Sequence, residues 1–235
     1  MKILVLNPNA SEMVTKKIEK AVMAVARKDV EVTVDRLEHG PEVLESYYDE
    51  ALATPYILEK VKEANRDGYD AIIIAAFCDP GIEALKEISD VPVYGTAETT
   101  FSAALLLGNK FSILTEKKHK ESVKIHQVRK MGLESRFAGV RALGMGVMEI
   151  GEEEEKVKMR GIEAARQMIE QDNAEVIIMG CASMAGYSRE MEKILGVPIL
   201  DPVTITYKVV EGLTELRIMH SKIGLFATPS EQKWL

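Results

Sequence analysis

The chain contains two cysteines, and each follows an apolar stretch that is typical of a buried parallel strand. Cys78 comes after residues 71–77, and Cys181 comes after residues 175–180. A helical pattern follows each cysteine in turn. Ligands bind beyond the carboxyl ends of the strands in open parallel sheets. The sequence therefore predicts two thiols at ligand-binding edges.

Two opposed thiols suit the inversion of a carbon next to a carbonyl. One thiolate removes a proton from one face, a planar enolate forms, and the second thiol returns a proton to the other face. Asp79 and Pro80 are predicted to be the N-cap and first residue of a helix after Cys78, and Ser183 is a candidate cap after Cys181. Such helix starts lower a thiol pKa from about 8.5 into the range of roughly 3.5–7.5. Backbone amides in the same loops would hold the oxyanion.

Other readings of the two cysteines remain open. A cysteine at the end of a buried strand is often only a small apolar residue. A disulfide between Cys78 and Cys181 is a further alternative, although free thiols are typical of intracellular chains. Zinc is disfavoured because no Cys-x-x-Cys or clustered histidine accompanies them. The matched placement of the two cysteines in a repeat favours function.

The chain has the pattern of a pseudo-repeat of roughly one hundred residues. Lys2–Asn7 resembles Lys110–Thr115, and the stretch Asp90–Gly95 after Cys78 resembles Gly196–Asp201 after Cys181. Strands and helices alternate in both halves, which requires parallel sheets with right-handed crossovers. The predicted fold class is α/β, with two pseudo-symmetric three-layer lobes and an active-site cleft between them.

The predicted boundaries follow the hydrophobic periodicity. The first lobe is expected to comprise residues 1–96 plus about 208–235, and the second residues 97–207. Strands are predicted at residues 3–6, 30–37, 71–77, 91–94, 111–114, 137–143, 175–179 and 199–200. Helices are predicted at residues 9–27, 49–65, 80–88, 99–107, 116–130, 152–170, 188–195 and 203–217. Asn9 with Glu12 resembles a capping box, and Lys222–Ala227 is expected to pair back onto the first lobe.

Composition narrows the class of protein. The 235 residues suffice to bury a sizeable core, and 29% of them are charged, as in folded globular proteins. A formal charge of −7 argues against a nucleic-acid partner. We find no apolar run of membrane-spanning length and no signal peptide, so we expect a cytoplasmic protein without a membrane partner.

Several motifs together resemble the aspartate/glutamate/hydantoin racemase superfamily, closest to its hydantoin and allantoin racemase branch. The matching segments are Asn7–Ser11, Tyr48–Ala53, Asp79–Gly81, Gly95–Glu98, Leu114–Thr115 and Gly180–Met184. In this order they cover nearly the whole chain. The resemblance implies an active site between two α/β lobes, a small-molecule substrate, no metal or other cofactor, and a homo-oligomer.

The resemblance also implies roles for single residues. Cys181 matches a catalytic cysteine, and Cys78 is the candidate second base. The expected substrate-side residues are Asn7, Asn9, Tyr48, Asp79, Thr115, Ala182 and Ser183. The chain departs from the family pattern at two places: Ala76 stands where the branch has its first thiol, and Ser183 stands where glycine is usual. The shift moves the sulfur by roughly 6–7 Å along an extended strand.

The resemblance leads to a first hypothesis of a racemase for a 5-substituted hydantoin, allantoin or a related amino-acid derivative, with Cys78 and Cys181 as alternating acid and base. A single-cysteine decarboxylase or cis–trans isomerase of the same superfamily is the second hypothesis. A non-catalytic two-lobed protein that binds a small molecule is the third.

Overall fold

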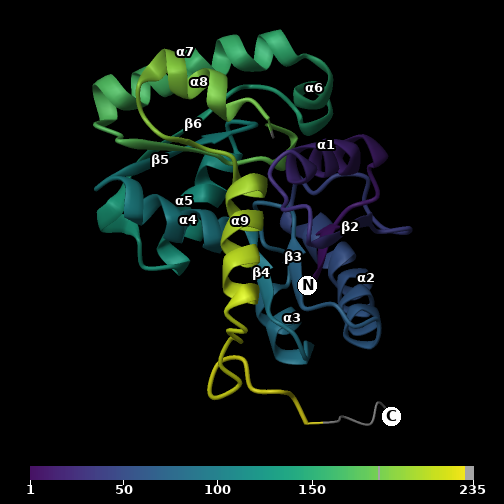
Figure 1. Ribbon diagram of the computed structural model, residues 1–235. Helices are drawn as coiled ribbons and strands as arrows, with labels where there is room; N and C mark the ends of the chain where they lie inside the picture. Colours follow the sequence, from purple (N-terminus) through teal and green to yellow (C-terminus); the bar gives the residue numbers. More distant parts are fainter. Residues whose placement is uncertain (185, 231–235) are drawn as a thin grey trace.

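The computed structural model describes residues 1–184 and 186–230, which form two four-stranded parallel sheets flanked by helices (Figure 1). The first sheet has the order β2 (Glu31–Arg36), β1 (Lys2–Asn7), β3 (Ala71–Ile74), β4 (Val93–Gly95). The second has the order β6 (Phe137–Ala142), β5 (Phe111–Thr115), β7 (Val176–Met179), β8 (Ile199–Leu200). The two orders are equivalent strand for strand, and the predicted fold class is confirmed.

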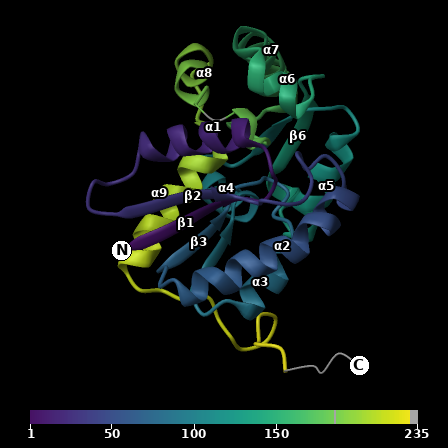
Figure 2. The ribbon, with the colours of Figure 1, turned by 90° about the vertical axis from the view of Figure 1, so that its right-hand side faces the viewer.

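Helices cover both faces of each sheet because each crossover carries one. In the first half these are α1 (Glu12–Met23), α2 (Tyr47–Arg66), α3 (Ile82–Ile88) and α4 (Thr96–Leu107). The second half of the chain contributes α5 (Lys120–Lys130), α6 (Val147–Glu152), α7 (Glu154–Asp172) and α8 (Ser188–Leu195), followed by α9 (Pro202–Glu215), which returns to pack on the first sheet. Figure 2 shows α1 and α9 on one face of the first sheet, with α2 and α3 on the other.

Alternating side chains of the strands supply the core. Ile3 and Val5 of β1 belong to one buried cluster, whereas Leu4 and Leu6 face α2 and α3 in another. The first of these clusters continues into the second half of the chain, where it includes Leu114. The two halves therefore share apolar packing, and α9 adds to it by lying against α1, α4 and β3.

Several predicted helix starts are wrong by a few residues. Ser11 caps α1 in place of Asn9, whose Oδ1 accepts hydrogen bonds from the Ser11 amide and from Asn7 Nδ2, both at 2.9 Å. The helix after Cys78 begins at Ile82 rather than at Pro80, because Gly81 at φ +66° turns the chain first. The helix predicted over 152–170 corresponds to α7, displaced by two residues at each end, and the short helix α6 before it was not predicted.

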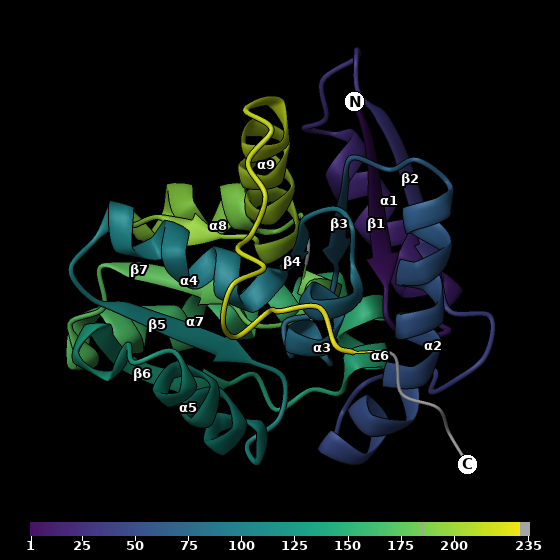
Figure 3. The same cartoon turned by 90° about the horizontal axis from the view of Figure 1, so that it is seen from below.

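The predicted strand pairing of Lys222–Ala227 is wrong, since no strand forms there. Instead Lys222 Nζ donates to the carbonyls of Lys86, at 2.6 Å, and Glu87, at 3.0 Å, at the end of α3. Figure 3 shows this tail running from α9 past α3. The predicted lobe boundaries stay a prediction, and residues 231–235 of the first lobe lie outside the described residues. Across the described ranges, no helix is long and apolar enough to cross a membrane.

Candidate active site

Both cysteines line one cavity between the carboxyl ends of β3 and β7, the equivalent strands of the two sheets. The cavity has a volume of about 50 Å³. It is lined by Asn9, Val14, Leu44, Ala75, Ala76, Phe77, Cys78, Glu116, Lys120, Lys124, Val147, Gly180, Cys181, Ala182 and Ser183. The lining therefore comes from both halves of the chain.

The residues expected to contact substrate divide into two groups. Besides the two cysteines, the cavity lining includes Asn9, Ala182 and Ser183. The other expected residues lie elsewhere: Asn7, Tyr48, Asp79 and Thr115. Tyr48 is 72% exposed on α2.

Buried polar contacts occupy two of the residues outside the cavity lining. The Asn7 amide nitrogen donates to Asn9 Oδ1 and Thr15 Oγ1, both at 2.9 Å. Thr115 Oγ1 donates to Glu116 Oε2 at 2.6 Å. Both side chains thus position residues that line the cavity, Asn9 and Glu116.

Cys78 is half-buried and lies at the boundary of two cavities. A neighbouring cavity of about 100 Å³ is lined by Cys78, Asp79, Glu98 and Gln127, among others. Burial raises the pKa of the Cys78 thiol above its ordinary value, and the nearby Glu50 carboxylate raises it further. Burial likewise raises the pKa of Glu50. The thiol and the carboxyl group are therefore both protonated more readily than in water.

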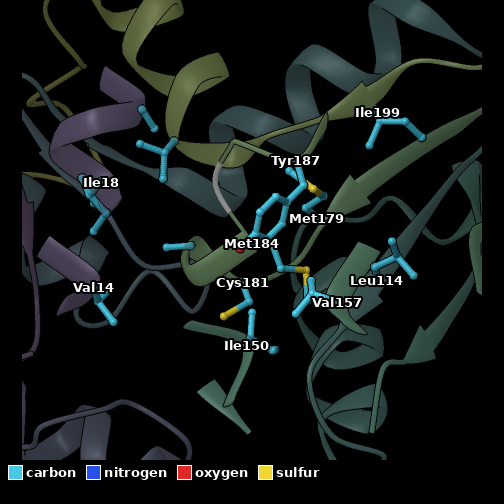
Figure 4. Close-up of a cluster of buried hydrophobic side chains, with 14 of the residues drawn as sticks. Val14, Ile18, Leu114, Ile150, Val157, Met179, Cys181, Met184, Tyr187 and Ile199 are labelled. Carbon is cyan, nitrogen blue, oxygen red and sulfur yellow. The ribbon is translucent and has the colours of Figure 1, made fainter. Parts of the chain in front are cut away.

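Cys181 lies in the core cluster shared by both halves, together with Val14, Ile150 and Met184 (Figure 4). Burial raises the pKa of its thiol to about 11, and the Glu116 carboxylate acts in the same direction. Hydrogen bonding from the amide and hydroxyl groups of Ser183 acts in the opposite direction but is outweighed. The expectation that helix starts lower the thiol pKa values is therefore wrong for both cysteines, because desolvation is the larger effect.

Asp79 caps a different helix from the one that was predicted. Its carboxylate accepts hydrogen bonds from the amides of Ala97 and Glu98, both at 2.9 Å, at the start of α4. A Cβ on Gly95 would lie 2.3 Å from Asp79 Cγ, so only glycine allows this approach. The residue after Cys78 is thereby held at φ +48°.

We expect the Asp79→Asn substitution to change how stability depends on pH. Burial, followed by the Glu98 carboxylate, raises the pKa of Asp79 to about 7, from an ordinary value of 3.8. Between these values the folded protein binds more protons than the unfolded chain, so this contribution to stability is full at low pH and is lost as pH rises toward 7. Urea titrations from pH 4 to 8 should therefore show the wild type losing its advantage over Asp79→Asn as pH rises. The exposed Asp90→Asn substitution is the control, and a constant difference across this range would contradict the prediction.

Sequence reasoning missed the charged residues that α5 contributes. Lys120 and Lys124 line the cavity and are each only 3% exposed, and Glu116 precedes the same helix. The signal was their spacing, since Lys120, Lys124 and Val128 form the buried stripe of α5 at four-residue intervals. Two lysines on the face that packs inward indicate a site rather than a solvated surface.

No group of three or more His, Cys, Asp or Glu side chains within residues 1–184 and 186–230 is arranged to hold a metal ion. The functional groups that line the cavity are two thiols, two ammonium groups, the Glu116 carboxyl group and the Asn9 and Ser183 side chains. These groups can transfer protons and hold a small molecule.

Comparisons with known proteins agree on one family. The model of the Asp/Glu/hydantoin racemase family matches residues 3–210. Hydantoin racemases of a Pseudomonas species (strain NS671) and of Paenarthrobacter aurescens are each 36% identical over 100% of the chain, covering 94% and 100% of those proteins. The crystal structure of allantoin racemase from Pseudomonas fluorescens has a TM-score of 0.94, with 32% identity and full coverage of both chains.

Proposed function

This chain belongs to the Asp/Glu/hydantoin racemase family, and we propose that it is a cofactor-independent racemase in which Cys78 and Cys181 are the two catalytic acid–base groups. The substrate we propose is a 5-substituted hydantoin, allantoin or a related amino-acid derivative. Relatives named hydantoin racemase and allantoin racemase support this substrate class.

The observation that carries the proposal is the matched position of the two thiols. β3 and β7 occupy equivalent places in the two sheets, and each is followed by a cysteine that lines the same cavity. A planar intermediate held there would have a sulfur available from each half of the chain. This arrangement suits removal of a proton from one face and its replacement on the other.

The proton balance is simple. The thiolate of one cysteine takes the proton from the reacting carbon, and the electron pair of the broken C–H bond moves onto the adjacent carbonyl oxygen. The other cysteine then donates its thiol proton to the opposite face of the carbon. The two sulfurs have exchanged protonation states, and the opposite enantiomer resets the enzyme in the reverse direction.

The cavity must widen to admit such a substrate. Its volume of about 50 Å³ is well below the approximately 300–1,000 Å³ of ligand pockets for drug-sized molecules. Leu44, in the loop before α2, and Val147, at the start of α6, both line it. Glu45 joins these segments, because its carboxylate accepts from Lys117 Nζ at 2.6 Å and from the Val147 amide at 3.2 Å.

We expect the Glu45→Gln substitution to raise KM about fivefold, because this partly exposed ion pair would contribute about 1 kcal/mol to holding the two segments together over a bound substrate. Steady-state kinetics measure this change in KM with a compound that the wild type racemises. Glu42→Gln is a matched control in the same loop, since Glu42 is exposed. Equal KM values for wild type and Glu45→Gln would show that the contact does not help to hold the substrate.

The activity itself is tested by optical rotation. Purified protein is incubated with each enantiomer of a panel of 5-substituted hydantoins and of allantoin, and loss of rotation is followed over time. The proposal predicts decay to zero rotation from both enantiomers of at least one compound. Decay of none of them would reject the proposed substrate class.

One feature also favours the single-cysteine alternative, a decarboxylase or a cis–trans isomerase. Ala76 stands where the resembling branch has its first thiol, and Cys78 lines the neighbouring cavity as well. A chain with one usable thiol would release or relocate a group instead of inverting a centre. Release of carbon dioxide from a disubstituted malonate, without racemisation of hydantoins, would support this alternative.

A further inference from the structure

Lys124 places a buried positive charge beside both thiols. Its side chain is 3% exposed, its ammonium group lies 4.8 Å from the centre of the Phe77 ring, and the residue lines the cavity. Its Cε would lie 3.5 Å from a Cβ on Gly180, the residue before Cys181. The charge acts on both thiols, where it opposes the effect of burial.

The Lys124 ammonium forms no hydrogen bond or ion pair with any of the residues 1–184 and 186–230. Lys120, one turn earlier and equally buried, differs because Glu116 Oε1 lies 4.0 Å from its Nζ. The ring of Phe77 offers Lys124 only a weak cation–π partner. The Glu50 carboxyl group lies close enough for Lys124 to lower its pKa, but burial has the larger, opposite effect, so Glu50 offers only a weakened counter-charge. A buried ammonium with so little compensation is costly to the fold, so its retention indicates an anion that arrives with the ligand.

The proposed reaction generates such an anion in the same cavity. When the C–H bond breaks, negative charge moves from the carbon, which lies between the two sulfurs, to the neighbouring carbonyl oxygen. Resting on the proposed racemase function, we propose that the Lys124 ammonium binds this carbonyl oxygen and stabilises the enolate. A side-chain cation thereby takes the role that the sequence had suggested for loop amides. The proton balance is unchanged, because Lys124 keeps its protons throughout.

Alkylation of the two thiols tests the effect of the Lys124 charge without relying on racemase activity. Iodoacetate is anionic and iodoacetamide is a neutral reagent of nearly the same size, so their rate ratio at one thiol cancels differences in thiolate content. We expect Lys124→Met to lower the iodoacetate-to-iodoacetamide ratio at Cys181 by about tenfold or more, as expected for loss of one charge at close range. The ratio is measured by peptide mass spectrometry for Cys78 and Cys181 separately.

Three further variants sharpen the test. Lys118→Met is the control, because Lys118 lies in the turn just before α5 with its side chain 88% exposed, and its ratio should equal that of the wild type. Lys120→Met should give a smaller change than Lys124→Met, because Glu116 offsets its charge. Lys124→Arg keeps the charge and should keep most of the ratio. Thermal unfolding should show Lys124→Met to be at least as stable as the wild type, since methionine buries without a charge.

Racemisation provides the second readout. Lys124→Met should lower kcat/KM by about 10²–10³-fold, the usual effect of removing one oxyanion-stabilising group. An unchanged alkylation ratio would overturn the proposal whatever the racemase rate. A lowered ratio with an unchanged racemase rate would also overturn it, because the charge would then face the thiols without serving the reaction. A wild type that racemises none of the panel but shows the ratio effect would reject the proposed function while retaining Lys124 as an anion-binding group.

Discussion

Cys181→Ala is expected to lower kcat for racemisation by about 10²–10⁴-fold, because one of two acid–base groups is removed from a step that needs both. Hydrogen exchange at the reacting carbon should survive for one enantiomer only, the one whose hydrogen faces Cys78. The measurement combines optical rotation with deuterium incorporation from heavy water, starting from each pure enantiomer. The one-sided exchange distinguishes loss of a base from loss of the fold.

Cys181→Ser is the matched variant for this first prediction. It keeps a small polar side chain at the end of β7 and replaces the thiol with a much weaker acid, so it should also be inactive in racemisation. Near-normal racemisation by either variant would remove Cys181 from the mechanism. Both variants should remain folded, because the thiol is one of many side chains in its buried cluster.

Cys78→Ala is expected to have an effect of the same size and the opposite stereochemistry. Racemisation should again fall by about 10²–10⁴-fold, and exchange should survive only for the enantiomer whose hydrogen faces Cys181. Each single variant would thus exchange the reacting hydrogen of one enantiomer only, and the enantiomer would differ between the two variants. Wild-type racemisation by Cys78→Ala would instead favour chemistry with a single thiol.

A double variant tests the position of the first thiol. Ala76 and Cys78 both line the cavity, and the resembling branch has its thiol at the earlier position. Combining Ala76→Cys with Cys78→Ala should restore racemisation at least tenfold over Cys78→Ala alone, since one acid–base group is worth more than that. If racemisation did not recover, a thiol at position 76 would be unable to replace the one at position 78 in the reaction.

Local patterns determined most of the elements and little of their capping. Apolar runs such as Ala71–Ile74 and Val176–Met179 can form buried strands whatever surrounds them, so these strands were predicted correctly. Where a helix starts depends on which hydrogen-bond acceptor lies next to its free backbone amides in the folded protein. Asp79 was assigned to the helix that follows it, but α4 lies within reach of the same carboxylate.

The segment after α9 shows the same limit of prediction from local sequence patterns. The alternating pattern of Lys222–Ala227 would suit an edge strand, yet the chain meets the carbonyls at the end of α3. An edge strand needs a neighbouring strand with free hydrogen-bonding groups, and sequence does not say which sheet edge lies nearby.

The sequence by itself determined the repeat, the α/β class and the equivalent places of Cys78 and Cys181, because these depend on short-range periodicity and on similarity between halves. Only the tertiary structure decided that desolvation raises both thiol pKa values and that the buried Lys124 charge acts on both thiols. The burial of a side chain and the electrostatic potential around it depend on neighbours that come from distant parts of the chain. A local sequence pattern does not show which residues become those neighbours.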